Sequence, residues 1–133
     1  MYTVQILDAL KTPLVNKFYA QYSVRGRANK QDQVWVVYKG MYIVAACRIQ
    51  NKHDFLFLST VFVAPQHRSK GLATRLLSAA VKHQPLPLYT FAYKSITALY
   101  MGLGFNQVLT YTPGLKALFD IYAHRNIVAL EYL

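Results

Sequence analysis

The sequence predicts an α/β fold, of the α+β kind, in which helices pack against a β-sheet. Three observations support this prediction. Two β-rich runs around a Gly-containing turn indicate an antiparallel hairpin in the first half of the chain. The second half follows the order strand, helix, strand, helix, which is typical of an α/β layer with at least one parallel strand pair. The length of 133 residues fits a single domain, residues 1–133.

The first half of the chain contains four predicted elements and one irregular stretch. Residues 2–7 alternate in the manner of a strand. A Thr-Pro pair at Thr12 then begins a helix, because Pro is favoured at the first helical position. Residues 23–33 are polar and lack periodicity, which indicates a loop or a short second helix where substrate could bind. Residues 34–38 and 41–49 form the strands of the hairpin.

The second half is built around a long apolar strand and an amphipathic helix. Residues 55–63 form an apolar run that Pro65 ends, so we expect a central strand covered on both faces. Beyond Gly71, apolar residues recur on one face of a helix, which stops before Pro85 and Pro87. The remaining predicted elements are a strand at 88–92, a helix at 95–103, a strand at 105–111, a turn at 112–114, a short helix at 115–124 and a closing strand at 127–133.

The charge balance indicates anionic partners. Fifteen Lys and Arg residues against five Asp and Glu residues give a formal net charge of +10, which attracts negatively charged ligands. A nucleotide cofactor accounts for only part of this excess. The remainder is compatible with binding to RNA, to the ribosome or to another acidic partner, and equally with a basic surface that keeps the protein soluble.

The composition argues against several classes of site and location. Cys47 is the single cysteine and lies in an apolar run, so we expect a buried packing residue that forms no internal disulfide. No Cys and His spacing resembles a ligand set, so no metal is expected. Residues 1–10 lack the features of a secretory signal, and no window reaches about 18 uninterrupted apolar residues. We therefore expect a cytoplasmic monomer or homodimer without membrane contact.

The segment from Val61 to Leu77 supports the functional inference. A buried strand runs through a Pro turn into a helix whose first turn contains Gly71. The first N–H groups of a helix lack intrahelical acceptors and lie at the positive end of its dipole, so they can bind a diphosphate. Gly71 lets a phosphate approach the backbone, while Arg68 and Lys70 add positive charge. An ordinary solvated turn would look similar, and the P-loop spacing is absent.

Two ordered motifs resemble the GNAT family of N-acetyltransferases. Residues 68–73, Arg-Ser-Lys-Gly-Leu-Ala, match the family pattern Gln/Arg-x-x-Gly-x-Gly/Ala. The Val-Ala-Pro sequence at 63–65 stands at the expected distance upstream, where the family has a strand ending in Val-x-Pro. Residues 98–100, Ala-Leu-Tyr, match a second family segment shortly before Gly-Phe at 104–105. The resemblance covers residues 34–111.

The resemblance implies a particular sheet, cofactor and cofactor site. The sheet would be central, mixed, mostly antiparallel and twisted, with six to seven strands flanked by helices and a splayed pair of parallel central strands, 55–63 and 88–92. The cofactor would be acetyl-CoA, with its pantetheine arm between these two strands. Main-chain groups of Val61, Phe62 and Val63 would line the acetyl and pantetheine end. The residues that would bind the pyrophosphate are Arg68, Ser69, Lys70, Gly71, Leu72, Ala73 and Thr74.

The resemblance also implies a direct attack of a neutral amine on the thioester, with one main-chain N–H polarising the carbonyl. Tyr100 matches the usual general acid, which protonates the departing thiolate, although it could simply pack its helix against the sheet. Tyr93 stands where many members have Asn, and Leu88 stands where some members have a Glu base. The base is therefore unassigned. The alternatives are a water chain, an amine that is already neutral, or one of Asp54, Asp120, Glu131, His53 and His124.

The sequence thus predicts an acetyl-CoA-dependent N-acetyltransferase that acts on a small-molecule amine or a protein amino group. Two alternatives stay open. One acetylates aminoacyl-tRNA or a ribosomal protein, which the charge of +10 would suit. The other binds acetyl-CoA without turnover and regulates a partner protein, which the unassigned base would suit. Arg25, Arg27 and Lys30 precede the hairpin and could contact an anionic acceptor or face water.

Overall fold

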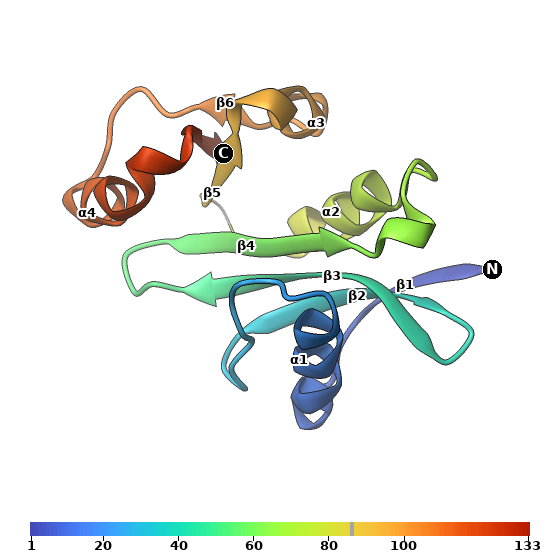
Figure 1. The fold of residues 1–133 in the computed structure, drawn as a ribbon. Helices are drawn as coiled ribbons and strands as arrows, with labels where there is room; N and C mark the ends of the chain where they lie inside the picture. The colour runs from blue at the N-terminus through green and yellow to red at the C-terminus, as the bar shows by residue number, and fades with distance from the viewer. Residues whose placement is uncertain (86) are drawn as a thin grey trace.

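The computed structural model describes residues 1–85 and 87–133 and contains one seven-stranded sheet with helices packed against it (Figure 1). The strands lie in the order β1-β2-β3-β4-β5-β7-β6, and only β4 and β5 pair in parallel among the pairs in these residues. The mixed, mostly antiparallel sheet is therefore confirmed. The strands are β1 (Tyr2–Ile6), β2 (Gln33–Lys39), β3 (Tyr42–Asn51), β4 (Leu56–Val63), β5 (Leu88–Tyr93), β6 (Asn106–Gln107) and β7 (Ile127–Tyr132). The α-helices are α1 (Thr12–Gln21), α2 (Leu72–Lys82), α3 (Thr97–Gly102) and α4 (Pro113–Tyr122).

The first four strands form an antiparallel unit whose two faces are covered by different helices. Alternate residues of a strand point to opposite faces of its sheet. In β2, Trp35 and Val37 join the apolar cluster that contains α2, whereas Val34 and Val36 join the cluster that contains α1. Figure 1 shows α1 and α2 on opposite sides of these strands. Strand β4 is central, as the sequence predicts, with Leu58 in the cluster that contains α2 and Phe62 packed against the cluster that contains α1. Its second half is only partly buried, because it lines the cavities described below.

The parallel strands β4 and β5 separate after a short stretch of pairing. The register runs from Leu56 opposite Leu88 to Leu58 opposite Thr90. Both strands continue beyond this point, but in the described residues β4 and β5 no longer pair with each other. A bulge bends β4 just after this point, because Thr60 has a φ of 55° and the register with β3 shifts there. The splayed pair implied by the family resemblance is present, and it opens a slot in the middle of the sheet.

The strand predicted at 105–111 is much shorter in the structure. Only Asn106 and Gln107 form β6. The N–H of Val108 still donates to the carbonyl of Ala129 at 3.0 Å, and the chain then leaves β7. The expected strand is therefore wrong over its second half, because its residues have no neighbouring strand after Val108.

The turn predicted at 112–114 is also wrong, because α4 already begins there. The Thr112 side chain accepts a hydrogen bond from the N–H of Leu115 at 3.3 Å and caps the helix. Pro113 occupies the first helical position, where its missing N–H costs nothing. The helix expected at 115–124 is real, but it starts earlier.

The polar stretch predicted at 23–33 is a loop up to residue 32 and contains no second helix, and Gln33 already begins β2. Asn16 of α1 fixes it with two hydrogen bonds, in which its side-chain amide donates to the carbonyl of Ala28 at 2.9 Å and its side-chain oxygen accepts from the Ala28 N–H at 2.8 Å. Gly26 has a φ of 108°, and a Cβ there would lie 3.0 Å from Oγ1 of Thr60. The loop therefore approaches the bulge of β4 closely.

The predicted packing role of Cys47 is confirmed, since its side chain is buried in the core beside Trp35 and Leu76. None of the helices in residues 1–85 and 87–133 combines the length and the apolar character needed to cross a membrane. Within the same residues, no three His, Cys, Asp or Glu side chains gather where they could hold a metal ion.

Candidate functional site

The connection between β4 and α2 adopts a conformation that favours glycine at the helix start. A short 3-10 helix, Pro65–His67, follows β4 and turns the chain. Gly71 then occupies the N-cap of α2 with a φ of 74°, in the left-handed region that residues with a Cβ rarely adopt. A Cβ on Gly71 would meet no atom within 4 Å, so the space in front of the helix is open.

The main-chain amides in this connection are available to a ligand. The first amide of α2 bonded to the chain itself is that of Arg75, which donates to the carbonyl of Gly71 at 3.1 Å. In the described part of the chain, the N–H groups of residues 69–74 have no acceptor, and no side chain caps the helix. Such a set of amides at the positive end of a helix dipole binds anions.

A cavity of about 510 Å³ extends from these amides to the slot between β4 and β5. On one side it is lined by residues of the helix start, on the other by Val61, Phe62 and Val63 of β4, and at its far end by Ile96, Leu99 and Tyr100. Every cofactor residue predicted from the sequence lines this cavity except Lys70, whose side chain is exposed beside it.

Arg68 closes the side of this cavity against β4. Its Nε donates to the carbonyl of Val63 at 2.9 Å, and its guanidinium lies over the ring of Phe62, 5.2 Å from the centroid. These contacts hold an exposed cation close to the free amides. The arrangement concentrates positive charge where the chain offers N–H groups.

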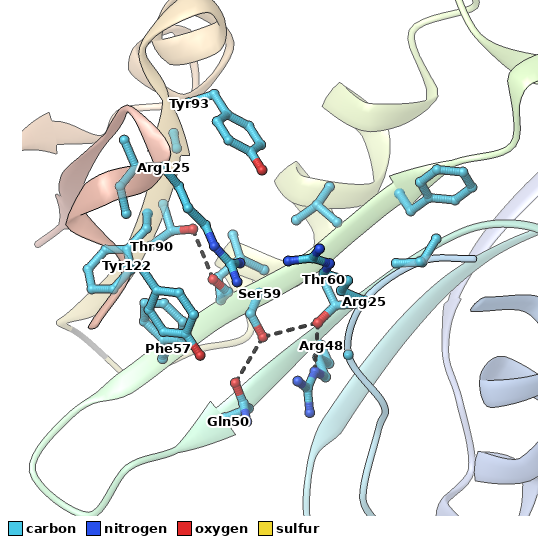
Figure 2. Close-up of a pocket in the computed structure, with 18 of the residues that line it drawn as sticks. Arg25, Arg48, Gln50, Phe57, Ser59, Thr60, Thr90, Tyr93, Tyr122 and Arg125 are labelled. Carbon is cyan, nitrogen blue, oxygen red and sulfur yellow. Dashed lines mark hydrogen bonds between the residues drawn. The ribbon is translucent and has the colours of Figure 1, made fainter. Parts of the chain in front are cut away.

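A second cavity, of about 670 Å³, lies on the other side of the slot (Figure 2). It shares Val61, Phe62, Ile96 and Tyr100 with the first cavity, so the two spaces adjoin. Its further walls come from the loop before β2, from β3, from β5 and from the segment around α4. Two molecules held in these cavities would meet beside Tyr100.

Tyr100 lies between the two cavities. Its side chain is only 4% exposed, and its ring packs edge-on against Phe105 with the centroids 5.6 Å apart. Burial, with a smaller contribution from the Cys47 thiol, raises the pKa of Tyr100 to about 12. The phenol therefore keeps its proton throughout the physiological range.

A chain of hydrogen bonds crosses the floor of the second cavity, as Figure 2 shows. The Nε of Arg48 donates to Oγ1 of Thr60 at 2.8 Å, the Thr60 hydroxyl lies 3.4 Å from the Ser59 hydroxyl, and Ser59 donates to Oε1 of Gln50 at 2.9 Å. Arg48 is also paired with Asp32 at 3.1 Å. These bonds fix the bulge in β4 and place two hydroxyl groups in the cavity.

None of the base candidates from the sequence lines either cavity in the described residues. Asp120 pairs with Lys116 on the surface of α4, and Asp54 lies against Gly114. Tyr93, which replaces the Asn of many family members, lines the second cavity and is 54% exposed. The second cavity is thus without a carboxylate or imidazole among its described lining residues.

The sequence reasoning missed several residues of the second cavity. Of the three basic residues noted before the hairpin, only Arg25 lines it, whereas Arg27 and Lys30 do not. Arg48 and Arg125 also line it, and neither is marked by a local motif. Arg125 comes from the turn after α4, far along the chain from Arg25, so only the folded structure brings them to one space.

Buried ionisable groups predict a loss of stability in alkali. Burial raises the pKa of the Cys47 thiol to about 12 from its ordinary value of 9.0, and that of Tyr100 to about 12 from 10.0. The unfolded chain therefore loses these protons first, so stability is complete below pH 9 and falls as the pH rises toward 12. We expect the free energy of unfolding to fall by up to about 1.4 kcal/mol per pH unit for each group.

Urea unfolding between pH 8 and pH 11 measures this effect. The variant Cys47→Ala is the control, since it lowers stability at every pH but flattens the decline that begins at pH 9. A free energy of unfolding that stays constant from pH 8 to pH 11 would contradict the buried, protonated state of both groups.

Solved structures of several proteins share this fold. They include Escherichia coli ElaA, with 17% identity, a TM-score of 0.72 and 100% of both chains covered. Diaminobutyrate acetyltransferase EctA from Paenibacillus lautus, in complex with L-2,4-diaminobutyric acid and coenzyme A, has 14% identity and a TM-score of 0.69 over 98% of this chain and 93% of that chain. A ribosomal-protein alanine N-acetyltransferase from Escherichia coli has 17% identity and a TM-score of 0.66 over 99% of this chain and 93% of that chain.

The sequence comparisons identify the family. Comparison with curated proteins finds no match. Residues 30–107 match the acetyltransferase (GNAT) domain family. This match spans more than half of the 133 residues and contains both the helix start at Gly71 and Tyr100. The chain therefore belongs to the GNAT family of acetyltransferases.

Proposed function

We propose that this protein is an acetyl-CoA-dependent N-acetyltransferase that transfers the acetyl group to a primary amine. The main support is the continuity of two features, the unbonded amides at the start of α2 and the slot between β4 and β5 that ends at Tyr100. A ligand with a diphosphate at the amides and a long arm in the slot fits both. Coenzyme A has this combination, and the diaminobutyrate acetyltransferase of the same fold is in complex with it.

In this proposal, the helix start binds the pyrophosphate. The N–H groups of residues 69–74 donate to its oxygens. The positive charges of the exposed side chains Arg68 and Lys70 attract the same phosphates. Because most contacts come from the main chain, the identity of the side chains at 69, 72, 73 and 74 matters less than the conformation at Gly71. The positive φ at Gly71 turns the chain so that the first amides of α2 face the open space.

The pantetheine arm lies along the part of β4 that has left β5. Main-chain groups of Val61, Phe62 and Val63 line this part of the slot. Amides and carbonyls there face no neighbouring strand on the β5 side, so an amide-containing arm can pair with them as a strand would. One N–H of this stretch polarises the thioester carbonyl and stabilises the oxyanion that forms.

The reaction is a direct attack of a neutral amine on the thioester carbon. The C–N bond forms, the carbonyl oxygen becomes an oxyanion, and the C–S bond breaks as the carbonyl returns. The nitrogen gives one proton to water, and the sulfur receives one from Tyr100, which water then reprotonates. Both protons are thus accounted for, and the products are the amide and free coenzyme A.

The position of Tyr100, which lines both cavities, supports its role in this last step. Because burial raises the pKa of Tyr100 to about 12, the phenol is protonated at physiological pH and can donate to the departing sulfur. A positioned donor of this kind contributes a factor of about 10²–10⁴ to a rate.

Calorimetric titration with acetyl-CoA, followed by measurement of thiol release with a broad panel of amines, tests the proposal. Binding followed by release of the thiol on at least one amine supports an acetyltransferase. Tight binding with no turnover on any amine indicates instead a protein that binds acetyl-CoA and regulates a partner. Absence of binding to any coenzyme A thioester rules out both.

Arg68→Ala is expected to weaken coenzyme A binding by only about tenfold, since a single exposed charge contributes about 1 kcal/mol or slightly more beside the main-chain contacts. The same calorimetric titration measures this change. Arg27→Ala, which removes an exposed arginine side chain that lines neither cavity, is the control. A complete loss of binding in Arg68→Ala would show that side chains, rather than main-chain amides, hold the cofactor.

The net charge of +10 supports a second candidate, an enzyme that acetylates aminoacyl-tRNA or a ribosomal protein. A ribosomal-protein alanine N-acetyltransferase has the same fold. Phosphate contacts make RNA affinity fall steeply as salt rises, so tRNA binding is measured at several salt concentrations. If tRNA does not bind even at low salt, the tRNA form of this candidate fails.

A further inference from the structure

The second cavity is positively charged. Four cationic side chains line it, and its described lining residues include no Asp or Glu. Arg48 is neutralised by Asp32 and fixes the β4 bulge. The side chains of the other three, Arg25, Lys52 and Arg125, form no ion pair or hydrogen bond within residues 1–85 and 87–133. An excess of unpaired cations around one cavity favours an anionic occupant.

Two of these cations reach the cavity from opposite walls. Arg25 belongs to the loop before β2, and Arg125 to the turn after α4. Figure 2 shows both side chains extending toward the middle of the cavity, in the region of Ser59 and Thr60. Arg125 lies over the ring of Tyr122, 4.8 Å from its centroid, and this contact limits the directions that it can take.

We propose that the acceptor is a small amine that also carries a carboxylate or phosphate group, which Arg25 and Arg125 bind from the two sides of the cavity. This inference rests on the proposed function, since it assigns the acceptor of the same site. The planar guanidinium groups offer paired N–H donors that match the oxygens of either anion. The cavity of about 670 Å³ has the size of a small-molecule site.

The anionic group sets the position of the amine. With the anion between the arginines, the amino group must reach the end of the cavity that adjoins the first one, which Val61, Phe62 and Tyr100 line in common. Aromatic side chains cover the remaining walls and suit the carbon skeleton of the acceptor. These are Tyr22, Phe57, Phe62, Phe91, Tyr93 and Tyr122.

The same charges account for a site without a carboxylate base. Nearby positive charge disfavours the ammonium form of a bound amine, and so lowers its pKa. The neutral amine is the nucleophile, so the cations increase its fraction without taking its proton themselves. A polyamine or a lysine-rich peptide, in contrast, would bring further positive charge into this cavity and would be repelled.

Calorimetric titration with matched pairs of probes tests the inference. The probes are the standard amino acids and the corresponding amino acid amides, 4-aminobutyrate and 1,4-diaminobutane, and 2-aminoethyl phosphate. Each is titrated into the protein with and without coenzyme A. We expect at least one acid to bind about tenfold or more tightly than its amide, because a charge-assisted hydrogen bond is lost in the amide. The phosphate probe shows which of the two anions is preferred.

Two variants assign the preference to the arginines. Arg25→Gln and Arg125→Gln are each expected to weaken binding of the preferred acid about tenfold or more and to leave the affinity for its amide unchanged. Arg27→Gln, an exposed arginine of the same loop that does not line the cavity, should retain the preference. Circular dichroism shows whether each variant is folded, and Arg25 is exposed, so its replacement should not disturb packing.

The outcomes separate this inference from the proposed function. Amides or diamines that bind as tightly as the acids, or a complete absence of binding by the anionic probes, overturn the inference even if another amine is acetylated. Lack of thiol release on every amine overturns the proposed function, whereas a preference for acids that depends on both arginines would still support the anionic site.

Discussion

Gly71→Glu is expected to abolish measurable coenzyme A binding, with a loss of affinity of at least about a hundredfold. The substitution places a carboxylate at the N-cap of α2, in the open space where the pyrophosphate is proposed to lie. Like charges at close range cost several kcal/mol, and the side chain also covers the free amides. Calorimetric titration with coenzyme A measures the loss.

Gly40→Glu is a matched control for this variant. Gly40 has a φ of 60°, close to the 74° of Gly71, and a Cβ there also meets no atom within 4 Å. Both variants therefore introduce the same charge and a similar backbone strain of about 1–2 kcal/mol. Gly40 lies in the turn between β2 and β3, away from both cavities. Equal affinity in both variants and the wild type would refute the proposed position of the pyrophosphate.

Tyr100→Phe is expected to lower kcat by about 10²–10⁴-fold while leaving coenzyme A affinity nearly unchanged. The variant keeps the ring that packs against Phe105 and removes only the hydroxyl that is proposed to protonate the sulfur. Steady-state kinetics with acetyl-CoA and the best acceptor measure kcat, and calorimetry measures binding. A variant with full kcat would leave Tyr100 with a packing role alone.

Tyr132→Phe is the control, because Tyr132 packs on the same Phe105 ring, with the centroids 5.4 Å apart, and does not line either cavity. The pH profile gives an independent test. Since the pKa of Tyr100 is about 12, its ionisation should not lower kcat between pH 7 and pH 10. A decline near pH 10 that disappears in Tyr100→Phe would show instead an ordinary, exposed phenol.

The elements with strong local patterns are those that the sequence predicts correctly. The β-rich apolar runs of β1 to β5 and the apolar stripe of α2 reflect contacts that each segment makes along its length. The strand predicted at 105–111 is wrong over its second half, because β6 ends at Gln107 and the chain then leaves β7. No local pattern reveals the lack of a neighbouring strand there. At Thr112, a Thr-Pro-Gly sequence suits a turn as well as a helix start, and the hydrogen bond from Leu115 decides between them.

The two parts of the candidate site also differ in how well the sequence predicts them. The helix start at 68–74 is one contiguous segment, so its composition alone indicates an anion site. The second cavity unites segments that are distant in sequence, and pairing across the sheet determines which of them meet. Arg125 has no neighbouring motif, and the partnership of Arg48 with Asp32 depends on the position of the loop before β2. Neither can be predicted without the folded chain.

The sequence segments that line each cavity affect how the protein can evolve. Apart from Ile96, Leu99 and Tyr100, the cavity beside α2 is lined by the single stretch 61–74, whereas the second cavity draws on the loop before β2 and on the segment around α4. Mutations in those outer segments can accumulate without altering the contiguous stretch. Acceptor preference can therefore diverge among descendants of this protein while recognition of the nucleotide is inherited.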